Sequence, residues 1–265
     1  MSRWVGTKET CDNEHIKKLY EVPQHEQRSE EWFEQRKHML TSSNAGAALG
    51  LVKQKSPDQV VLDYCGAGKP FVGNIATQHG QYWEDPAIDY YCASMNYRNY
   101  NFGLLPFYWK ERDDVILDEN GNEIDLSFIG GSVDGMVQDL NDPQGPPRVI
   151  EVKCPWRRKI VMGKCPEYYY PQVQLNMFIT DVWEADFFEY EPGREEKEKI
   201  NIVRCYRDQR WLEKNIPIMR KVWDQVLYYR EHGIENHPKM MKKKKKVLTL
   251  PAPQEKEECM IRPDH

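Results

Sequence analysis

The sequence has no hydrophobic run that is long enough to cross a membrane. A membrane-spanning helix needs about 18 consecutive apolar residues, and the 265-residue chain contains no such stretch. Residues 1–18 also lack the apolar core of a signal peptide. We therefore expect a soluble, intracellular protein that has no membrane partner.

The sequence also lacks the cysteine spacing of a disulfide framework or a zinc site. Its 7 cysteines are scattered, and no two of them form a C-x-x-C pair. Disulfide frameworks use an even set of cysteines in a short chain, and zinc sites use closely spaced pairs. Free thiols are therefore expected.

A third feature that the chain lacks is an excess of basic residues. Its formal net charge is −5, with 42 acidic and 37 basic side chains. This charge argues against a protein that coats nucleic acid by bulk electrostatics. It does not exclude an enzyme that acts on DNA, because carboxylates that hold a metal add negative charge and basic residues can gather locally.

The apolar content is high enough for a folded protein. Hydrophobic residues make up 40% of the chain and aromatic residues 12%, well above the content of disordered sequences. We expect an N-terminal arm over residues 1–25, one folded domain over 26–235 and a basic, flexible tail over 236–265. Residues 238–247 resemble a nuclear-import signal, so the host nucleus is one predicted location.

Hydrophobic periodicity predicts an α/β fold, with a central mixed sheet flanked by helices and the site at one edge of that sheet. Ser29 precedes two glutamates and begins a helix, as an N-cap residue does. Pro86 predicts a restart or kink in the helix expected over 76–94. Strand patterns occupy 104–152, a buried helix 168–180, further strands 183–203 and an amphipathic helix 216–232.

Three charged residues on two predicted strands carry the chemistry. Asp134 follows one strand, while Glu151 and Lys153 are two residues apart on another and so point to the same face. If the strands pair, these side chains meet at one point. Oxygen ligands from Asp134, Glu151 and the backbone carbonyl of Val152 suit Mg²⁺, for which Mn²⁺ can substitute. The lysine can orient or deprotonate a water.

The alternative is a solvated strand with a single salt bridge. For an isolated Glu-x-Lys this alternative is the more common case. Here Glu151 lies between Ile150 and Val152, and Asp134 precedes a glycine. A charge in such an apolar or tight setting needs a partner or a metal, which favours the site.

The chain resembles the lambda exonuclease, YqaJ and herpesvirus alkaline nuclease group of the PD-(D/E)xK nuclease superfamily, whose fold has a restriction-endonuclease-like core. The likeness extends over residues 28–192 and includes five motifs in order. These are Trp32 and Arg36 with Thr41 and Ser43, Glu84 in a helix, Ser132 and Asp134, Glu151 with Lys153, and Gln172 with Gln174.

The resemblance implies a Mg²⁺-dependent 5′-to-3′ exonuclease that digests linear double-stranded DNA to mononucleotides and uses two metal ions. In such enzymes the residues that match Arg36, Ser43 and Ser132 form a pocket for the 5′-phosphate. Glu84 would support the metal or its water, and Gln174 would orient the attacking water or the scissile phosphate. Three of these residues also have a simpler interpretation. Arg36 can be a surface arginine stacked on Trp32, Glu84 an exposed helix acid, and Gln174 a buried glutamine that forms hydrogen bonds.

The resemblance also implies partners, namely DNA ends and a single-strand annealing protein, and either a homotrimeric ring or a monomer; a viral origin is expected. Trp156 and Arg157, followed by two further basic residues, follow the Glu-x-Lys strand. They can grip the DNA backbone or stack on a base, or simply form a solvated basic turn.

Two other functions are compatible with these residues. A structure-specific endonuclease of the same superfamily needs no terminal phosphate, so the predicted phosphate pocket favours the exonuclease. A DNA-binding module with a decayed site is disfavoured because the metal site is intact. A RecB-like nuclease with an iron–sulfur cluster is disfavoured too, because the late cysteines do not cluster.

Overall fold

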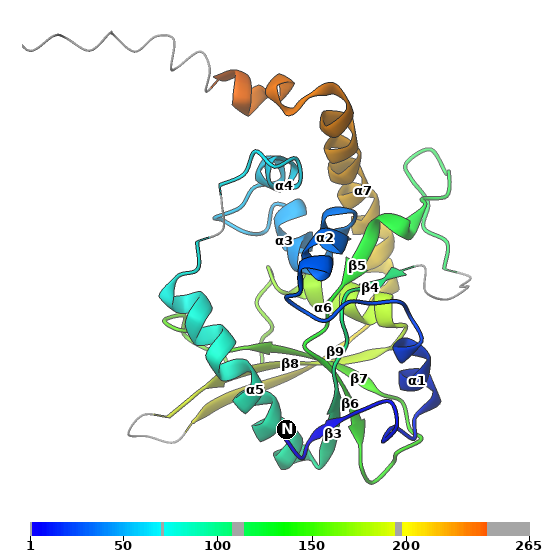
Figure 1. Cartoon of the computed structure of the whole chain (residues 1–265), viewed down its shortest axis with the longest axis vertical. Coiled ribbons are helices and arrows are strands. Elements are labelled where there is room, and N and C mark those ends of the chain that lie inside the picture. The colour runs from blue at the N-terminus through cyan, green and yellow to red at the C-terminus, as the bar shows by residue number, and fades with distance from the viewer. Residues whose placement is uncertain (1, 70–71, 108–113, 194–197, 243–265) are drawn as a thin grey trace, which may run out of the picture.

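Six strands form a mixed sheet in the order β1-β3-β6-β7-β8-β9 (Figure 1). The computed structural model describes residues 2–69, 72–107, 114–193 and 198–242. Neighbours β1–β3 and β7–β8 run parallel, and the other three pairs run antiparallel. The strands are β1 (Val5–Gly6), β3 (Tyr97–Tyr100), β6 (Gly135–Asp139), β7 (Arg148–Lys153), β8 (Glu184–Glu191) and β9 (Lys199–Tyr206).

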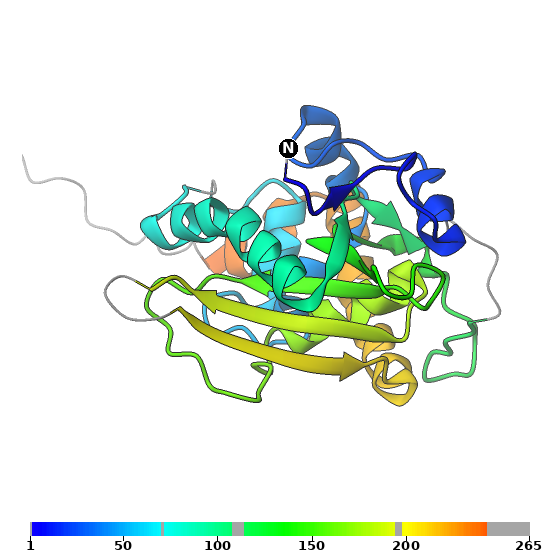
Figure 2. The ribbon, with the colours of Figure 1, turned by 90° about the horizontal axis from the view of Figure 1, so that it is seen from below.

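Helices cover both faces of this sheet. On one face, α5 (Ile75–Met95) packs its buried side chains against Ile150 and Val152 of β7. On the other face, α6 (Tyr170–Thr180) packs against Val149 of the same strand. Figure 2 shows α5 running along one side of the strands. Because consecutive strand residues point to opposite faces, Glu151 faces the same side as Val149, toward α6.

A small second sheet connects two of the predicted motifs. Its strands β2 (Leu40–Thr41), β5 (Ile129–Gly131) and β4 (Leu105–Pro106) lie in the order β2-β5-β4. The parallel register places Thr41 beside Gly130. Strand β2 leads into the segment that carries Ser43, and β5 leads into the segment that carries Ser132 and Asp134. Because β2 and β5 are adjacent, these two segments begin side by side.

The remaining helices pack around α6 and the small sheet. They are α1 (Glu14–Tyr20), α2 (Glu30–Lys37), α3 (Ser42–Ala48), α4 (Pro57–Tyr64) and α7 (Gln209–His232), with short 3₁₀ turns at Leu126–Phe128 and Ile234–Asn236. Ser29 caps α2 as expected, because its side chain accepts a hydrogen bond from the Trp32 amide at 3.1 Å. Among the described helices, none is long and apolar enough to cross a membrane.

The structure differs from expectation at several points. The expected arm contributes β1 to the sheet, and Ile16 and Leu19 of α1 are fully buried. Helix α5 continues through Pro86 without a restart. Pro86 is exposed, so water can bind the carbonyl that the proline leaves unpaired. The site lies at the ends of central strands rather than at an outer edge, because the sheet continues for three strands on one side of β7 and for two on the other.

Much of the predicted tail lies outside the described residues. The structure describes the chain only as far as residue 242, so most of the lysine run is not included. The nuclear-import signal and the boundaries of the domain and the tail therefore stay predictions.

A buried ion pair stabilises the face of the sheet beneath α5. Asp186 on β8 is fully buried and accepts hydrogen bonds from the Tyr91 hydroxyl at 2.5 Å and from Arg204 Nε at 2.6 Å. Asp186→Ala should lower the free energy of unfolding by about 2 kcal/mol, because Arg204 loses its hydrogen bonds to the buried carboxylate and keeps only its pair with Glu184. Tyr91→Phe should cost only about 1 kcal/mol. Urea unfolding measures both, and equal losses would contradict this role for Asp186.

Candidate active site

Strand β7 brings Glu151 and Lys153 together as predicted. Glu151 is fully buried, and one of its carboxylate oxygens accepts a hydrogen bond from the Lys153 ammonium. Burial and the nearby charge of Asp134 raise the pKa of Glu151 to about 8. Burial alone would lower the pKa of Lys153, but the charges of Glu151 and Asp134 outweigh it and raise that pKa above its usual value. In the metal-free protein the two carboxylates therefore favour the protonated form of Lys153.

Asp134 joins this pair at the end of the β6–β7 ladder. The ladder ends where Gly135 faces Ile150. Beyond that point the Asp134 carboxylate accepts a hydrogen bond from the Val152 amide at 2.7 Å. The N–H and C=O of one strand residue point to the same side, so the Val152 carbonyl also faces Asp134. All three predicted metal-binding positions thus meet at one point.

Glu84 approaches the same centre from α5. Burial and the charge of Asp134 raise the pKa of Glu84 to about 7. One of its oxygens lies 3.8 Å from the guanidinium of Arg28. The proline two residues later does not displace Glu84, since α5 is continuous.

The donor set fits a hard divalent cation. The charges of Asp134, Glu84 and Glu151 repel one another when these carboxylates are ionised, and a bound cation would relieve that repulsion. In the described part of the chain no three His, Cys, Asp or Glu side chains form a group that could hold a metal ion. The predicted ligands are two carboxylates and one backbone carbonyl. That set suits Mg²⁺, which usually keeps several water ligands.

The predicted phosphate pocket is also assembled. The Arg36 guanidinium donates a hydrogen bond to Ser43 Oγ at 3.1 Å and lies 4.3 Å from the centre of the Trp32 ring. The Trp32 indole donates to Ser132 Oγ at 2.9 Å. Arg36 thus contacts one predicted serine directly and reaches the other through Trp32. Over the described ranges, no carboxylate forms an ion pair with Arg36.

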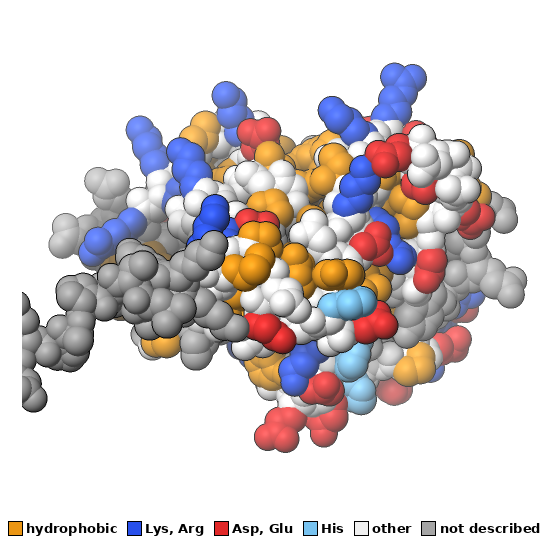
Figure 3. Space-filling view, turned by 90° about the horizontal axis from the view of Figure 1, so that it is seen from above, with side chains coloured by type: hydrophobic (Ala, Val, Ile, Leu, Met, Phe, Trp, Pro, Cys, Tyr) orange, Lys and Arg blue, Asp and Glu red, His pale blue; other side chains and the backbone are white. Residues whose placement is uncertain are grey.

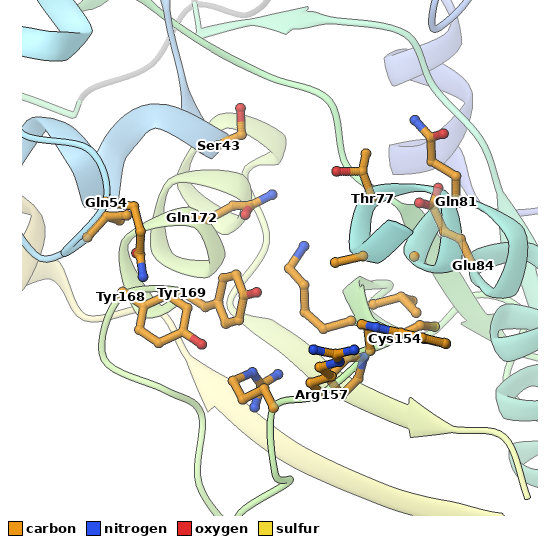
Figure 4. Close-up of a pocket in the computed structure, with 18 of the residues that line it drawn as sticks. Ser43, Gln54, Thr77, Gln81, Glu84, Cys154, Arg157, Tyr168, Tyr169 and Gln172 are labelled. Atoms are coloured by element: carbon orange, nitrogen blue, oxygen red, sulfur yellow. The ribbon is translucent and has the colours of Figure 1, made fainter. Parts of the chain in front are cut away.

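A cleft of about 1000 Å³ connects the two groups of residues. It lies between α6, which carries Gln172, and α5, which carries Glu84 (Figure 4). Ser43 lines one part of the cleft and Lys153 another. The cleft therefore extends from Ser43, which contacts Arg36, to Glu84 and Lys153.

Trp156 and Arg157 line the same cleft. Arg157 is exposed, and the Trp156 ring lies 5.0 Å from that of His79. The next residue, Arg158, instead forms an ion pair of 2.5 Å with Glu189, a fully buried glutamate. On the face shown in Figure 3, the described basic and acidic side chains are interspersed.

These features agree with a comparison against known families. The model for the YqaJ-like viral recombinase domain matches residues 31–183. The chain belongs to this family. The match confirms the resemblance inferred from the motifs, and its span includes all five of them up to Gln174.

One relative and two solved structures of an exonuclease are similar to this YqaJ-like chain. An uncharacterized protein of Acanthamoeba polyphaga mimivirus is 29% identical over 187 residues, which are 67% of this chain but 31% of that protein. The alkaline exonuclease of Laribacter hongkongensis has a TM-score of 0.58 alone and 0.59 in complex with dAMP. Both structures are 20% identical and cover 83% of this chain and 100% of their own. They confirm the predicted fold class, a central mixed sheet flanked by helices.

Gln174 does not reach the YqaJ-like site, which corrects the sequence prediction. Its side chain donates to the Tyr206 carbonyl and accepts from the Asp208 amide, each at 2.8 Å. Residues four apart share a helix face, whereas residues two apart lie on nearly opposite faces. Gln172 and Asn176 therefore share a face, and Gln172 is the glutamine that lines the cleft.

Asn176 is a site residue that the sequence interpretation missed. Its amide donates a hydrogen bond to the second oxygen of Glu151 at 2.9 Å, and both side chains are buried. Asn176 therefore fixes the orientation of the carboxylate from the side opposite Lys153. Its spacing of four from Gln172, within an apolar helix, was the available signal.

Stability should depend on pH and on divalent ions. In metal-free protein the folded-state pKa values of Glu84 and Glu151 lie above the usual value of 4.5, at about 7 and about 8. Between the usual value and these raised values, the folded state holds more protons than the unfolded state. The free energy of unfolding should therefore fall as the pH rises from about 5 to about 8.

Urea unfolding at several pH values, with chelator or with Mg²⁺, measures this effect. Saturating Mg²⁺ should restore about 2–3 kcal/mol at the alkaline end. Asp134→Asn should flatten the pH dependence in chelator and remove the gain from Mg²⁺. A Mg²⁺ gain that Asp134→Asn retains in full would place the ion elsewhere.

The two glutamines should behave differently when replaced. Gln174→Ala should lower the free energy of unfolding by about 1–3 kcal/mol, because two backbone groups lose their partner. Gln172→Ala, at a position that faces the cleft, should change stability by less than about 0.5 kcal/mol. Thermal and urea unfolding of both variants test this contrast, and the reverse order would restore Gln174 to the site.

Proposed function

We propose that this chain is a Mg²⁺-dependent 5′-to-3′ exonuclease that digests linear double-stranded DNA to mononucleotides. The observation that carries the proposal is the cleft that joins Ser43, beside Arg36, to Lys153 and Glu84. An anion site at a fixed place beside a set of carboxylates is what an enzyme that starts at a phosphorylated end requires.

The surroundings of Arg36 favour a terminal phosphate. A guanidinium matches phosphate oxygens with two parallel hydrogen bonds. The ring of Trp32 orients the guanidinium, and the hydroxyls of Ser43 and Thr41 lie at 3.1 and 3.4 Å. A 5′-terminal phosphate has one more ionisable oxygen than an internal linkage, so such a pocket favours an end.

The residues around Glu151 support cleavage of a phosphodiester. When bound, Mg²⁺ supplies Lewis-acid stabilisation of the charge on the phosphate. Lys153 contacts one oxygen of Glu151, so its amino group lies where it can orient or deprotonate a water beside the metal. Asn176 holds the second oxygen of Glu151, which keeps the carboxylate from rotating.

The comparisons support the substrate class and the biological setting. A solved structure of similar fold is an alkaline exonuclease in complex with dAMP. The family description, viral recombinase, supports a role in recombination, in which 3′ single strands are annealed. We accordingly include a single-strand annealing protein and a viral source in the proposal, with either a trimeric ring or a monomer as the acting form.

A comparison of DNA ends tests this function. Wild-type protein with Mg²⁺ should release mononucleotides from linear duplex DNA with a 5′-phosphate, far more slowly from a 5′-hydroxyl end, and not from closed circles. Arg36→Ala should lower kcat/KM on phosphorylated ends by about 10- to 100-fold, the value of one or two charged hydrogen bonds. It should change the rate on hydroxyl ends little.

Two controls complete the experiment. Lys153→Ala should abolish release from every substrate, whereas Lys221→Ala, which removes a charge from α7 that pairs with Glu119, should leave all rates unchanged. Two results would instead identify a structure-specific endonuclease. One is that the wild type cleaves closed circles as fast as linear DNA, and the other is that Arg36→Ala loses equal activity on phosphorylated and hydroxyl ends.

A further inference from the structure

A second cleft, of about 460 Å³, opens onto the same carboxylates. Asp134 and Glu84 line one wall, and Arg28 belongs to the segment that lines another. Of the residues around the two clefts, Glu84 is common to both. The proposed exonuclease reaction assigns Asp134 and Glu84 to the metal site but gives no role to the opposite wall of the second cleft, so Arg28 needs a separate explanation.

The backbone at Arg28 has an unusual conformation. Its φ of 72° lies in the left-handed region, where a side chain other than glycine costs energy. Hydrogen bonds hold the preceding residue firmly: Gln27 Nε2 donates to the carbonyl of Phe102 at 2.8 Å and to that of Val133 at 3.2 Å. Because Val133 precedes Asp134, these bonds fix Arg28 relative to the carboxylate centre.

The guanidinium of Arg28 is poorly paired in the described part of the protein. Its side chain is 56% exposed, and its one ion pair, with Glu84, has a distance of 3.8 Å. That distance is too long for a hydrogen bond, and an exposed pair of this kind contributes little to stability. Stability therefore does not explain the strained backbone. The donors of Arg28 are available to a ligand in the second cleft.

We propose that Arg28 binds a phosphodiester of the DNA strand, in the second cleft, next to the linkage that is cleaved. This inference rests on the proposed function. Glu26 and Asp85 also line this cleft, so an anion enters only when a divalent ion offsets the charge of the carboxylates. Arg28 would thus hold the strand on one side of the centre while Arg36 holds its 5′-end on the other.

Three variants separate the guanidinium from the backbone that carries it. Arg28→Gly adopts a φ of 72° without strain, so its melting temperature should equal or exceed that of the wild type. Its kcat/KM on 5′-phosphorylated DNA should nevertheless fall by about 10- to 100-fold. Arg28→Lys should recover part of this loss, and Arg28→Ala should lose both activity and stability. Wild-type activity in Arg28→Gly would overturn the proposal.

Neutral DNA linkages identify the phosphate that is bound. One methylphosphonate is placed at successive positions near the 5′-end, and kcat/KM is measured for each substrate. At one position adjacent to the scissile linkage the wild type should lose activity while Arg28→Gly loses none. Equal penalties in both proteins at every position would show that Arg28 acts on Glu84 instead, and would overturn the phosphate contact.

A binding measurement gives a readout that does not depend on cleavage. In the Lys153→Ala background with Mg²⁺, adding Arg28→Gly should reduce the slope of log affinity against log salt by about one phosphate contact. An unchanged slope would count against the subsite. If wild-type protein fails to degrade DNA at all, the proposed function fails, whereas active wild type with an equally active Arg28→Gly refutes the subsite alone.

Discussion

The carboxylate of Glu151 is fully buried at the end of a central strand, and the neighbouring residues are arranged around that charge. A lone ionised carboxylate in such a place would cost several kcal/mol, at the order-of-magnitude level of buried charges. Lys153 binds one oxygen and Asn176 the other. Asp134 and Glu84 add negative charge nearby, so the charge of the group is offset either by protonation of the glutamates, whose pKa values are raised, or by a bound cation.

Pairing between short strands places the other site residues around Glu151. The parallel pairing of β2 with β5 puts Thr41 and Ser43 close to the chain that continues to Ser132 and Asp134. The antiparallel pairing of β6 with β7 then ends at Gly135, so Asp134 reaches Val152 with its side chain. Two motifs that are about 90 residues apart in the sequence thereby begin side by side, as expected when strand pairing fixes register.

Much of this site could be predicted from local rules. The two-residue period of a strand correctly placed Glu151 and Lys153 together, and the Ser29 cap correctly began the helix that carries Trp32 and Arg36. These features depend on neighbouring residues, so the sequence contains them directly. The family motifs added Ser43 and Ser132, whose connection through Trp32 arises only in the tertiary structure.

The rotation of α6 could not be predicted, and the reason is physical. Nearly every residue of this helix is buried, so no polar stripe marks which face meets the site. Gln174 and Gln172 were then equivalent choices, and the spacing of four between Gln172 and Asn176 becomes informative only once Gln172 is known to face the site. The N-terminal strand was missed for a similar reason, since two residues, Val5 and Gly6, are too few to show a period.

The central claim is that Asp134, Glu151 and the Val152 carbonyl together hold a divalent ion beside Lys153. Anomalous diffraction from crystals grown with Mn²⁺ tests it most directly. A peak should lie within coordination distance of these three ligands, about 2.0–2.2 Å for such an ion, and should vanish in Asp134→Asn. A Mn²⁺ peak bound only by other residues, or one that persists unchanged in Asp134→Asn, would contradict the claim.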